Sequence, residues 1–442
     1  YYLPVMVYAL LFKVFSPNAA VINILNGVLF VINGALVFLI VQKLLRTQKE
    51  ALNISSKEID IIALLTTISS SFLTFTYLRL SLLDNYEVLS YTLILLMVFL
   101  ALDRQIKPII LGAVGGLLFL SKPSFAFFIF TITFYFLLPD IKNFKRFFLR
   151  GLVAVLGFFI IVSPFIIRSI ILTGEPLFAL QNKVDIIKGI VYSHDQLYKS
   201  FSIPPAAKKV ISNNIDLFFQ RWGIRFVSAI KNLFSIETIA AWIGIPLLII
   251  KVKERRDFIL SYLFFLIIHM IVVANYLEVT DTVRIYTSIL PFLIVLGYTG
   301  IFVYFYLFFK DKLPVMTKRI IVSLGICAIL TISVLVAQKY ALSKVRTGIT
   351  GFSDDLITEI NELNPKCVYS NAPYETAWFL NIPTIYAPYN LEEISYSGPK
   401  ECEYFLTKVE SEKTVSFLEN IGVLLVESDG YRLYKINELP IR

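Results

Sequence analysis

Ionisable side chains interrupt long apolar stretches at four places in this chain. LRLSLLDNYEV contains Arg79, Asp84 and Glu87; LSKPSF contains Lys122; SPFIIRSII contains Arg168; and LEVTDTVRIY contains Glu278, Asp281 and Arg284. Cations grouped at a membrane boundary can capture an anionic substrate, because charges attract most strongly where water is scarce. In a simpler interpretation, each long side chain reaches from a helix end to water and anchors the helix. The combination of four cations with several carboxylates favours a binding site.

Histidine and cysteine, which often bind transition metals, are sparse and scattered. The two histidines are His194 and His269, and neither they nor the three cysteines have the spacing of a metal site. The cofactor stays unknown: the sequence does not exclude a divalent metal ion, although it has no ligand pattern for one, and no glycine pattern for nucleotide phosphates stands out. His269 lies within an apolar run, where an ionisable residue is a functional candidate. We favour the simpler interpretation, a neutral imidazole hydrogen-bonded to a neighbouring helix.

The apolar stretches define the class of protein. Hydrophobic residues make up 57% of the 442 residues and charged residues 17%, whereas soluble domains contain ~45–50% apolar and ~25% charged residues. Most of the excess lies in runs near the ~20 residues that cross a bilayer as a helix. We predict an α-helical, multi-pass protein of the cell membrane with ten spans at 19–45, 61–78, 86–102, 108–120, 123–138, 152–171, 236–250, 258–277, 285–309 and 320–336. Residues 4–15 are apolar but short, which is typical of a helix lying in the membrane interface.

Lysine and arginine alternate between the connections of these spans. The connections after spans one, three, five, seven and nine carry two to four cations each, whereas three other short connections carry one each: Arg79, Lys122 and Arg284. Since cytoplasmic loops are enriched in cations, this pattern places those three connections outside the cytoplasm. The net charge of +9 therefore reflects membrane topology and does not indicate a nucleic-acid partner.

The sequence predicts two domains. Residues 1–344 form the membrane domain, in which 172–235 is a long outer loop with one or two amphipathic helices on the membrane surface. Residues 345–442 form a small, soluble, extracytoplasmic α/β domain, because short β-rich runs alternate there with helical patterns. The predicted strands are 367–370, 384–387, 404–407, 423–426 and 431–436, and the predicted helices include 354–363 and 412–420.

Cys367 and Cys402 each lie at or just before a predicted strand of this small domain. If the two strands are neighbours, the cysteines come within disulfide range, and a disulfide persists outside the cytoplasm. The alternative is two buried free thiols that pack as small hydrophobic side chains. We favour the free thiols.

Several stretches resemble the GT-C superfamily of membrane glycosyltransferases, in particular the protein O-mannosyltransferases and the aminoarabinose transferase of lipid A. YYLPVMVYALLFKVFSPNAAVINILNGVLFVINGALVFLI is similar to the family's juxtamembrane helix and following span. RLSLLDNYE resembles its arginine–aspartate motif, GLLFLSKPSFAFF its lysine–proline turn, and SPFIIRSIILTGEPLF and VRIYTSILPFLIVLGY its later arginine motifs. VYSNAPYETAWFLNIPTIYAP resembles the extracytoplasmic domain appended to many members.

This resemblance implies an inverting glycosyltransferase. It implies transfer of a sugar from a polyprenyl-phosphate donor to a protein, lipid or glycan acceptor on the outer face of the membrane. The matching positions are Arg284, Lys122, Arg168 and Arg79 for the donor phosphate, Asp84 as a supporting acid, and Glu87, Glu278 and Asp281 for the acceptor. The family's principal catalytic carboxylate precedes the stretch that aligns with 1–15, so we expect that residue upstream of Tyr1.

A multi-pass transporter or flippase of a lipid-linked or anionic substrate is the alternative from another class. It also explains ten spans and a cationic outer end. A transporter of this kind is expected to have broken helices at the bilayer midplane and paired repeats. No repeat stands out in this sequence. A polymerase or ligase of surface polysaccharide shares the donor type but not these motifs.

The charge pattern predicts the topology directly. Reporter fusions after Lys145 and after Lys253 should behave as cytoplasmic, and a fusion after Lys344 as external, because the cations of the first two connections stay inside. Paired alkaline phosphatase and green fluorescent protein fusions measure this. An external reporter at Lys253 would show that the number of preceding spans is wrong.

Overall fold

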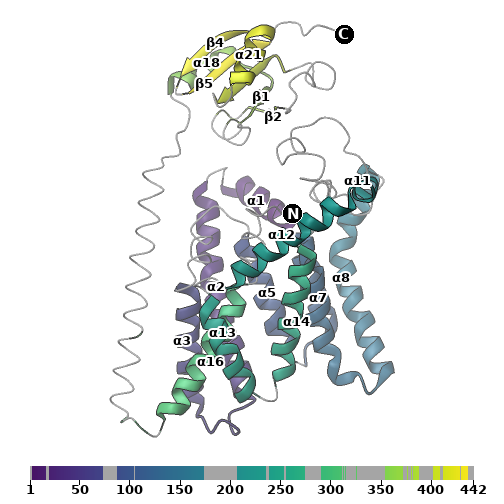
Figure 1. Cartoon of the computed structure of the whole chain (residues 1–442), viewed down its shortest axis with the longest axis vertical. Coiled ribbons are helices and arrows are strands. Elements are labelled where there is room, and N and C mark those ends of the chain that lie inside the picture. Colours follow the sequence, from purple (N-terminus) through teal and green to yellow (C-terminus); the bar gives the residue numbers. More distant parts are fainter. Residues whose placement is uncertain are drawn as a thin grey trace. The chain divides into compact units, whose positions relative to one another are not determined.

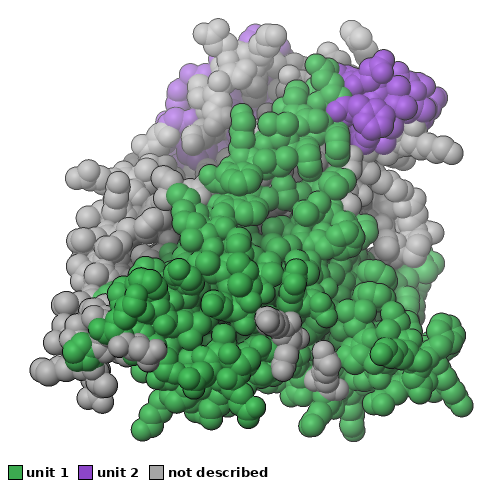
Figure 2. All heavy atoms as spheres, turned by 60° about the horizontal axis from the view of Figure 1, so that its bottom comes forward, with its two compact units in different colours: residues 1–178, 220–341 green, residues 179–219, 342–442 purple. Residues whose placement is uncertain are grey.

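A computed structural model describes two groups of residues. The first group is 2–15, 19–72, 87–103, 105–173, 207–234, 238–252, 255–273, 290–310, 312, 314 and 325. The second is 354–371, 376, 380, 382–387, 402–408, 412–428 and 430–436. The chain divides into two compact units (Figure 2): unit 1 is Tyr1–Phe178 with Gln220–Ala341, and unit 2 is Ala179–Phe219 with Leu342–Arg442. The predicted domain boundary at 344/345 lies outside the described residues.

Unit 1 is a bundle of helices (Figure 1). Its described helices are α1 (Tyr2–Phe15), α2 (Ala19–Arg46), α3 (Ser56–Phe72), α5 (Glu87–Ala101), α6 (Pro108–Ser121), η1 (Pro123–Phe125), α7 (Ala126–Leu137), η2 (Leu138–Asp140), α8 (Phe144–Thr173), most of α12 (Ile215–Leu233), α13 (Ile239–Lys251), α14 (Arg256–Val273) and α16 (Leu290–Phe309).

Three helices among the described residues are long and apolar enough to cross a membrane: Val21–Arg46, Phe144–Ile171 and Pro291–Phe309. They correspond to the predicted first, sixth and ninth spans. Shorter apolar helices include Glu87–Ala101 and Pro108–Ser121, at the predicted third and fourth spans. Apart from Gly325, the predicted tenth span lies outside the described residues. The helices are thus compatible with a membrane protein, and the number of ten spans stays a prediction.

The helix at the predicted sixth span begins eight residues earlier than the sequence suggested, at Phe144 instead of 152. Asn143 explains the earlier start, because its side-chain oxygen accepts a hydrogen bond from the backbone N–H of Arg146 at 3.1 Å. Such a cap satisfies one of the N–H groups that have no partner inside the first helical turn. Because Lys145, Arg146 and Arg150 are charged, the hydropathy pattern hides the beginning of this helix.

The cations of the predicted basic connections gather at one end of unit 1. Lys43, near the end of α2, donates to Asp103 after α5 at 3.0 Å, and this hydrogen bond, against the opposing effect of burial, lowers the pKa of Asp103. Arg255, just before α14, donates to the hydroxyl of Tyr135 in α7 at 3.2 Å. Similar contacts join Arg46 to Asp60, Arg146 and Arg150 to Asp140, Tyr306 to Glu58, and Lys310 to the carbonyl of Asn53. The cations that follow predicted spans one, five, seven and nine therefore share one end, and its cytoplasmic location stays a prediction.

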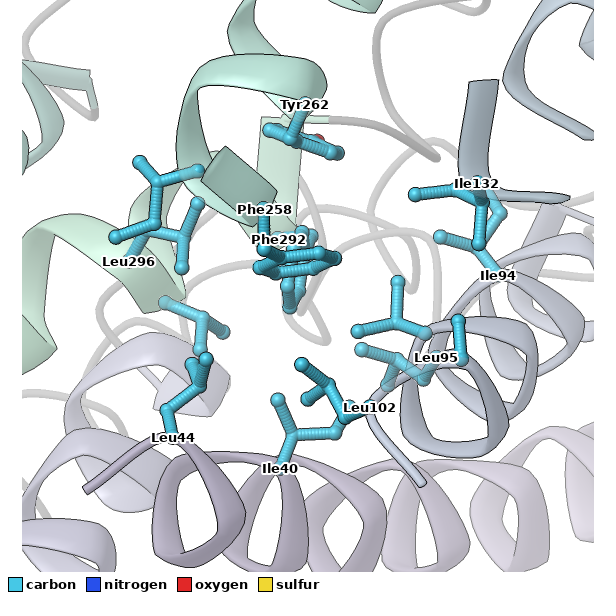
Figure 3. Close-up of a cluster of buried hydrophobic side chains, with 14 of the residues drawn as sticks. Ile40, Leu44, Ile94, Leu95, Leu102, Ile132, Phe258, Tyr262, Phe292 and Leu296 are labelled. Carbon is cyan, nitrogen blue, oxygen red and sulfur yellow. The ribbon is translucent and has the colours of Figure 1, made fainter. Parts of the chain in front are cut away.

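Large apolar side chains hold these helices in place. In Figure 3, side chains from α2, α5, α7, α14 and α16 converge. The rings of Tyr262 and Phe292 lie 4.9 Å apart in an edge-to-face arrangement, and those of Tyr135 and Phe258 lie 5.1 Å apart. Edge-to-face pairs add about 0.5–1.5 kcal/mol beyond their buried area. The two ring pairs join α14 to α16 and to α7.

Glycine lets α6 and α8 touch through their backbones. A Cβ atom at Gly112 would overlap the carbonyl oxygen of Ala154, and one at Gly116 would lie 2.9 Å from the carbonyl oxygen of Phe158. Gly112 lies next to Ala154 and Gly116 next to Phe158, so the residue numbers increase in the same direction along both helices. The helices α6 and α8 therefore run parallel. Their C-terminal ends, with Lys122 and Arg168, consequently lie at the same end of the bundle, opposite the basic connections.

Unit 2 contains the predicted small α/β domain. The described elements of this domain are α18 (Asp354–Leu363), β1 (Val368–Ser370), β2 (Thr384–Tyr386), β3 (Tyr404–Lys408), α21 (Glu412–Ile421), β4 (Gly422–Ser428) and β5 (Tyr431–Ile436). The strands form one sheet in the order β2-β1-β3-β5-β4. β1 is parallel to β2 and β3, whereas β5 is antiparallel to β3 and β4. The sequence prediction of a small sheet with helices in this region is confirmed.

Cys367 and Cys402 form a disulfide with a Cα–Cα distance of 4.9 Å. The expectation of two free thiols is wrong. The sequence did not show which strands are neighbours. In the structure, β1 and β3 are adjacent and Val368 lies opposite Tyr404. This register brings the residues before the two strands together, which a list of strands without their order does not predict.

The disulfide predicts a simple labelling result. When the complete protein is denatured without reductant and treated with N-ethylmaleimide, we expect one label per chain, on Cys327, and three labels after reduction. Closing a loop of 35 residues should also stabilise the domain by about 3–4 kcal/mol through the unfolded chain. Mass spectrometry counts the labels, and three labels without reduction would rule the bridge out.

Candidate functional site

Three of the eight residues predicted to form the site lie among the described residues. Glu87 is the first residue of α5, Lys122 follows α6, and Arg168 lies in α8. The other five, Arg79, Asp84, Glu278, Asp281 and Arg284, lie outside the described residues. The structure therefore shows one part of the predicted site, at the end of unit 1 opposite the basic connections.

Glu87 and Lys122 form an ion pair that is almost completely removed from solvent. Nζ of Lys122 donates a hydrogen bond to Oε1 of Glu87 at 2.7 Å, and each side chain is only 3% exposed. The two residues come from two separate stretches that the sequence marked for chemistry. Since removing one partner of a buried pair leaves an uncompensated charge, at a cost of about 3–5 kcal/mol, the pair joins these two stretches firmly.

The backbone around Lys122 directs its side chain into this pair. Lys122 ends α6 in an extended conformation, with φ −157° and ψ 103°, while its N–H still donates to the carbonyl of Leu118. Pro123, the first residue of η1, accounts for this conformation, because proline disfavours the helical region for the residue before it. The lysine–proline sequence therefore stops α6 and starts a new turn at the charged residue.

A second polar contact lies one helical turn from the ion pair. The hydroxyls of Ser90 and Ser121 are 2.5 Å apart and fully buried. Ser90 lies three residues after Glu87, on the same face of α5, and Ser121 directly precedes Lys122. Two adjacent polar contacts therefore fix the start of α5 against the end of α6.

Aromatic side chains close the site on the side of α14. Nζ of Lys122 lies 5.7 Å from the ring centroid of Phe125. The ring of His269 stacks on Phe125, with centroids 5.9 Å apart and an angle of 11° between the ring planes. The ring of Phe265 lies 5.3 Å from His269, which is fully buried. His269 thus lies next to the predicted site, a proximity that the sequence did not indicate. The favoured interpretation of His269 as a hydrogen-bonded structural residue stays a prediction.

Burial separates the described cations into two kinds. Lys122 is 2% exposed, which is inconsistent with a lysine that extends along a helix to reach water. Arg168, by contrast, is exposed on α8, as an anchoring residue would be. The structure brings Lys122 together with Glu87, and it shows no contact between Arg168 and this pair among the described residues.

The sequence identified the two charged residues of the site but did not predict that they contact each other. Glu87 and Lys122 were both candidates, but nothing in their spacing of 35 residues predicts that they meet. A serine near each charge was a usable signal: Ser90 lies three residues after Glu87, and Ser121 directly precedes Lys122. Polar residues in apolar helices often mark contacts between helices. Among the described residues, no group of three or more histidine, cysteine, aspartate or glutamate residues could hold a metal ion.

Comparisons of the chain with protein-family models, curated proteins and solved structures gave no match. The class of the protein therefore rests on its apolar helices and on the site itself. These observations define a mostly helical protein with candidate membrane spans and a buried, charged site at one end of its helical unit.

A double-mutant cycle tests the buried pair. Lys122→Met and Glu87→Gln should each destabilise unit 1 by about 3–5 kcal/mol, because each leaves one buried group without its partner. The double variant should be less destabilised than the sum of the two single variants, since both charges are then absent. Thermal unfolding of the purified protein in detergent measures the three differences. Strictly additive effects would show that the two side chains do not interact.

Proposed function

We propose that this protein is an inverting glycosyltransferase that takes a sugar from a polyprenyl-phosphate donor and transfers it to a protein, lipid or glycan acceptor on the outer face of the cell membrane. The observation that carries the proposal is the buried Glu87–Lys122 pair. It joins two stretches that resemble separate motifs of the GT-C superfamily, at the end of unit 1 opposite the basic connections. A cation held away from water at a membrane boundary suits a lipid-linked phosphate.

The reaction follows from the chemistry of the donor. A nucleophilic atom of the acceptor attacks the anomeric carbon while the bond from that carbon to the phosphate oxygen breaks. A carboxylate accepts the proton of the acceptor, which contributes about 10²–10⁴-fold to the rate. The electron pair of the broken bond stays on the phosphate, and polyprenyl phosphate leaves with an additional negative charge. Cations fixed near that oxygen stabilise the transition state most effectively.

The predicted residues divide this work. Lys122 and Arg284 hold the donor phosphate, with Arg168 and Arg79 in support, and Glu87, Glu278 and Asp281 contact the acceptor while Asp84 orients a partner. An arginine can bind phosphate through two parallel N–H groups, whereas a lysine acts as a point charge. Because Lys122 already pairs with Glu87, the two carry no net charge together. The phosphate consequently needs the arginines as well.

The charge pattern and the disulfide both support the proposed location. The described basic connections share one end of unit 1, as the positive-inside rule requires of cytoplasmic loops, so Lys122 belongs to the outer face. The Cys367–Cys402 disulfide supports an extracytoplasmic C-terminal domain, because such bonds persist in oxidising compartments. Membrane lipids and the lipid-linked sugar are the partners that this placement implies.

One observation favours the transporter or flippase instead. α2 buries Asn26 and Asn33, and α3 buries Thr66 and Ser69, all of them within helices that the proposal places in the membrane. Buried polar side chains inside a membrane often mark a transport pathway. They also occur as hydrogen-bonding residues between packed helices, which is the interpretation that the transferase requires.

A transfer assay tests the function and the phosphate-binding residues together. The purified native gene product in lipid nanodiscs should release polyprenyl phosphate from at least one member of a panel of labelled polyprenyl-phosphate sugars when acceptor is present. Arg284→Ala should lower turnover by about 10²-fold or more, and Arg284→Lys should restore it only in part, because a point charge cannot replace a two-pronged contact.

Turnover is expressed per folded molecule, which separates chemistry from expression. If Arg284 only anchors its helix, Arg284→Lys will have normal turnover and Arg284→Ala will lower the yield of folded protein instead. Movement of the labelled lipid across a sealed vesicle without any transfer to acceptor would favour the flippase.

A further inference from the structure

The basic turn, residues 138–150, follows α7 and includes the first residues of α8. It contains four cations and one carboxylate, that of Asp140. Both arginines of the turn contact this carboxylate: Nε of Arg146 lies 3.0 Å and Nη1 of Arg150 lies 2.5 Å from its oxygens. One carboxylate between two guanidinium groups leaves this contact with a net positive charge.

The other two cations of the basic turn, Lys142 and Lys145, are exposed. Neither contacts a carboxylate among the residues that the structure describes. Lys145 lies in the first turn of α8, which contains no acidic residue. Since the N-terminal end of a helix carries a partial positive charge, cations are unfavourable there. Such a local conflict is expected where residues serve a function, and an anion from outside the protein would relieve it.

Large apolar side chains surround these lysines and face outward. Phe144 and Phe148 are 76% and 57% exposed, and their rings stack with centroids 6.2 Å apart. Ile141, next to Lys142 in the sequence, is 54% exposed. Neighbouring exposed apolar side chains mark a site that contacts another protein or a membrane. The cations beside them indicate that the partner is anionic.

The length of α8 indicates that this partner is a lipid. Its segment Phe144–Ile171 has 28 residues and is long and apolar enough to cross a membrane, and at about 1.5 Å per residue it extends about 42 Å. The hydrocarbon core of a bilayer is only about 30 Å thick, so the ends of this segment reach the headgroups. Leu152 and Leu156 are each 55% exposed and continue the face of Phe148. This face lies beside acyl chains, and the basic turn lies beside lipid phosphates.

We propose that the basic turn binds the headgroup of an anionic phospholipid, whose acyl chains run along the exposed face of α8. The inference needs an α8 that spans a membrane and does not depend on the proposed glycosyl transfer. Lys142 and Lys145 contact the phosphate as point charges, and Phe144 and Phe148 insert beside it, as in interfacial segments that bind anionic lipids. The basic turn belongs to the end of unit 1 that we predict to face the cytoplasm, where the leaflet surface is negative.

The experiment compares an anionic lipid with a zwitterionic one. The purified complete protein in detergent is titrated with phosphatidylglycerol and, separately, with phosphatidylcholine of the same acyl chains, and native mass spectrometry counts the bound lipids. The variants are Lys142→Gln/Lys145→Gln and Lys142→Arg/Lys145→Arg. The matched control is Lys49→Gln/Lys57→Gln, which removes two exposed lysines, each directly before a glutamate, from the same end of unit 1.

The proposal expects a selective loss of affinity. Wild type should bind phosphatidylglycerol about 10-fold or more tightly than phosphatidylcholine. Lys142→Gln/Lys145→Gln should bind phosphatidylglycerol about 10- to 30-fold more weakly than wild type, because each cation near an anionic lipid contributes about fivefold. Lys142→Arg/Lys145→Arg and the control should resemble wild type. Affinity for phosphatidylcholine and the melting temperature without lipid should be unchanged, since the substituted lysines are exposed.

Four results would overturn the proposal. The first is equal affinity of wild type for the two lipids. The second is an equal loss of phosphatidylglycerol binding in Lys49→Gln/Lys57→Gln, which would assign the preference to the overall charge of this end of unit 1. Displacement of phosphatidylglycerol by inorganic phosphate would show that the basic turn binds free phosphate instead of a lipid. A lower melting temperature of Lys142→Gln/Lys145→Gln, with an equal loss of affinity for both lipids, would assign the two lysines to the stability of the fold.

Discussion

A buried charge needs a counter-charge within contact distance. At one end of the helical unit, the Glu87–Lys122 pair meets this requirement, and the positions of several helices depend on it. Lys122 meets Glu87 only if α6 stops at Ser121, the chain turns at Pro123, and α5 starts at the correct height. The glycine contacts between α6 and α8 and the aromatic core around α14 hold the helices at those positions. Packing elsewhere in the bundle thus determines whether the site can form at all.

The two ends of the bundle use charge in different ways. At the basic end, the Lys43–Asp103 side chains are 28% and 38% exposed and the Arg46–Asp60 side chains 56% and 46% exposed, so water screens them. Exposed pairs contribute only about 0–1 kcal/mol each, which suits residues whose predicted role is to orient the protein in the membrane. The Glu87–Lys122 side chains are each 3% exposed, and their charges act at close range with little screening. The proposed binding of a phosphate therefore fits this second end better than the basic end.

Local sequence patterns predicted most of the helices and strands. They did not predict which residues far apart in the sequence contact each other. Apolar runs located α5 and α6 to within a residue or two, because a charged residue stands at each end of both runs. The disulfide was misjudged because it depends on β1 and β3 being neighbours, and strand order is not a local property.

The site shows the same division between local and long-range information. Lys122 and Glu87 stood out because charges are rare in apolar sequence, and Pro123 indicated the turn beside one of them. Their contact depends on the packing of α5 against α6, to which no single motif points.

The pairing of Glu87 with Lys122 also limits how a transferase could use this site. A lone buried lysine would be unfavourable whenever no ligand is bound, and Glu87 removes that cost. Nζ of Lys122 and Oε1 of Glu87 are only 2.7 Å apart. If Lys122 holds the donor phosphate and Glu87 contacts the acceptor, the two substrates must therefore lie next to each other. An inverting displacement has this requirement, because the attacking atom and the leaving oxygen flank a single carbon. In the proposed reaction, an acceptor that hydrogen-bonds to Glu87 would weaken the hold of Glu87 on Lys122 and would leave more of the lysine's charge for the leaving phosphate.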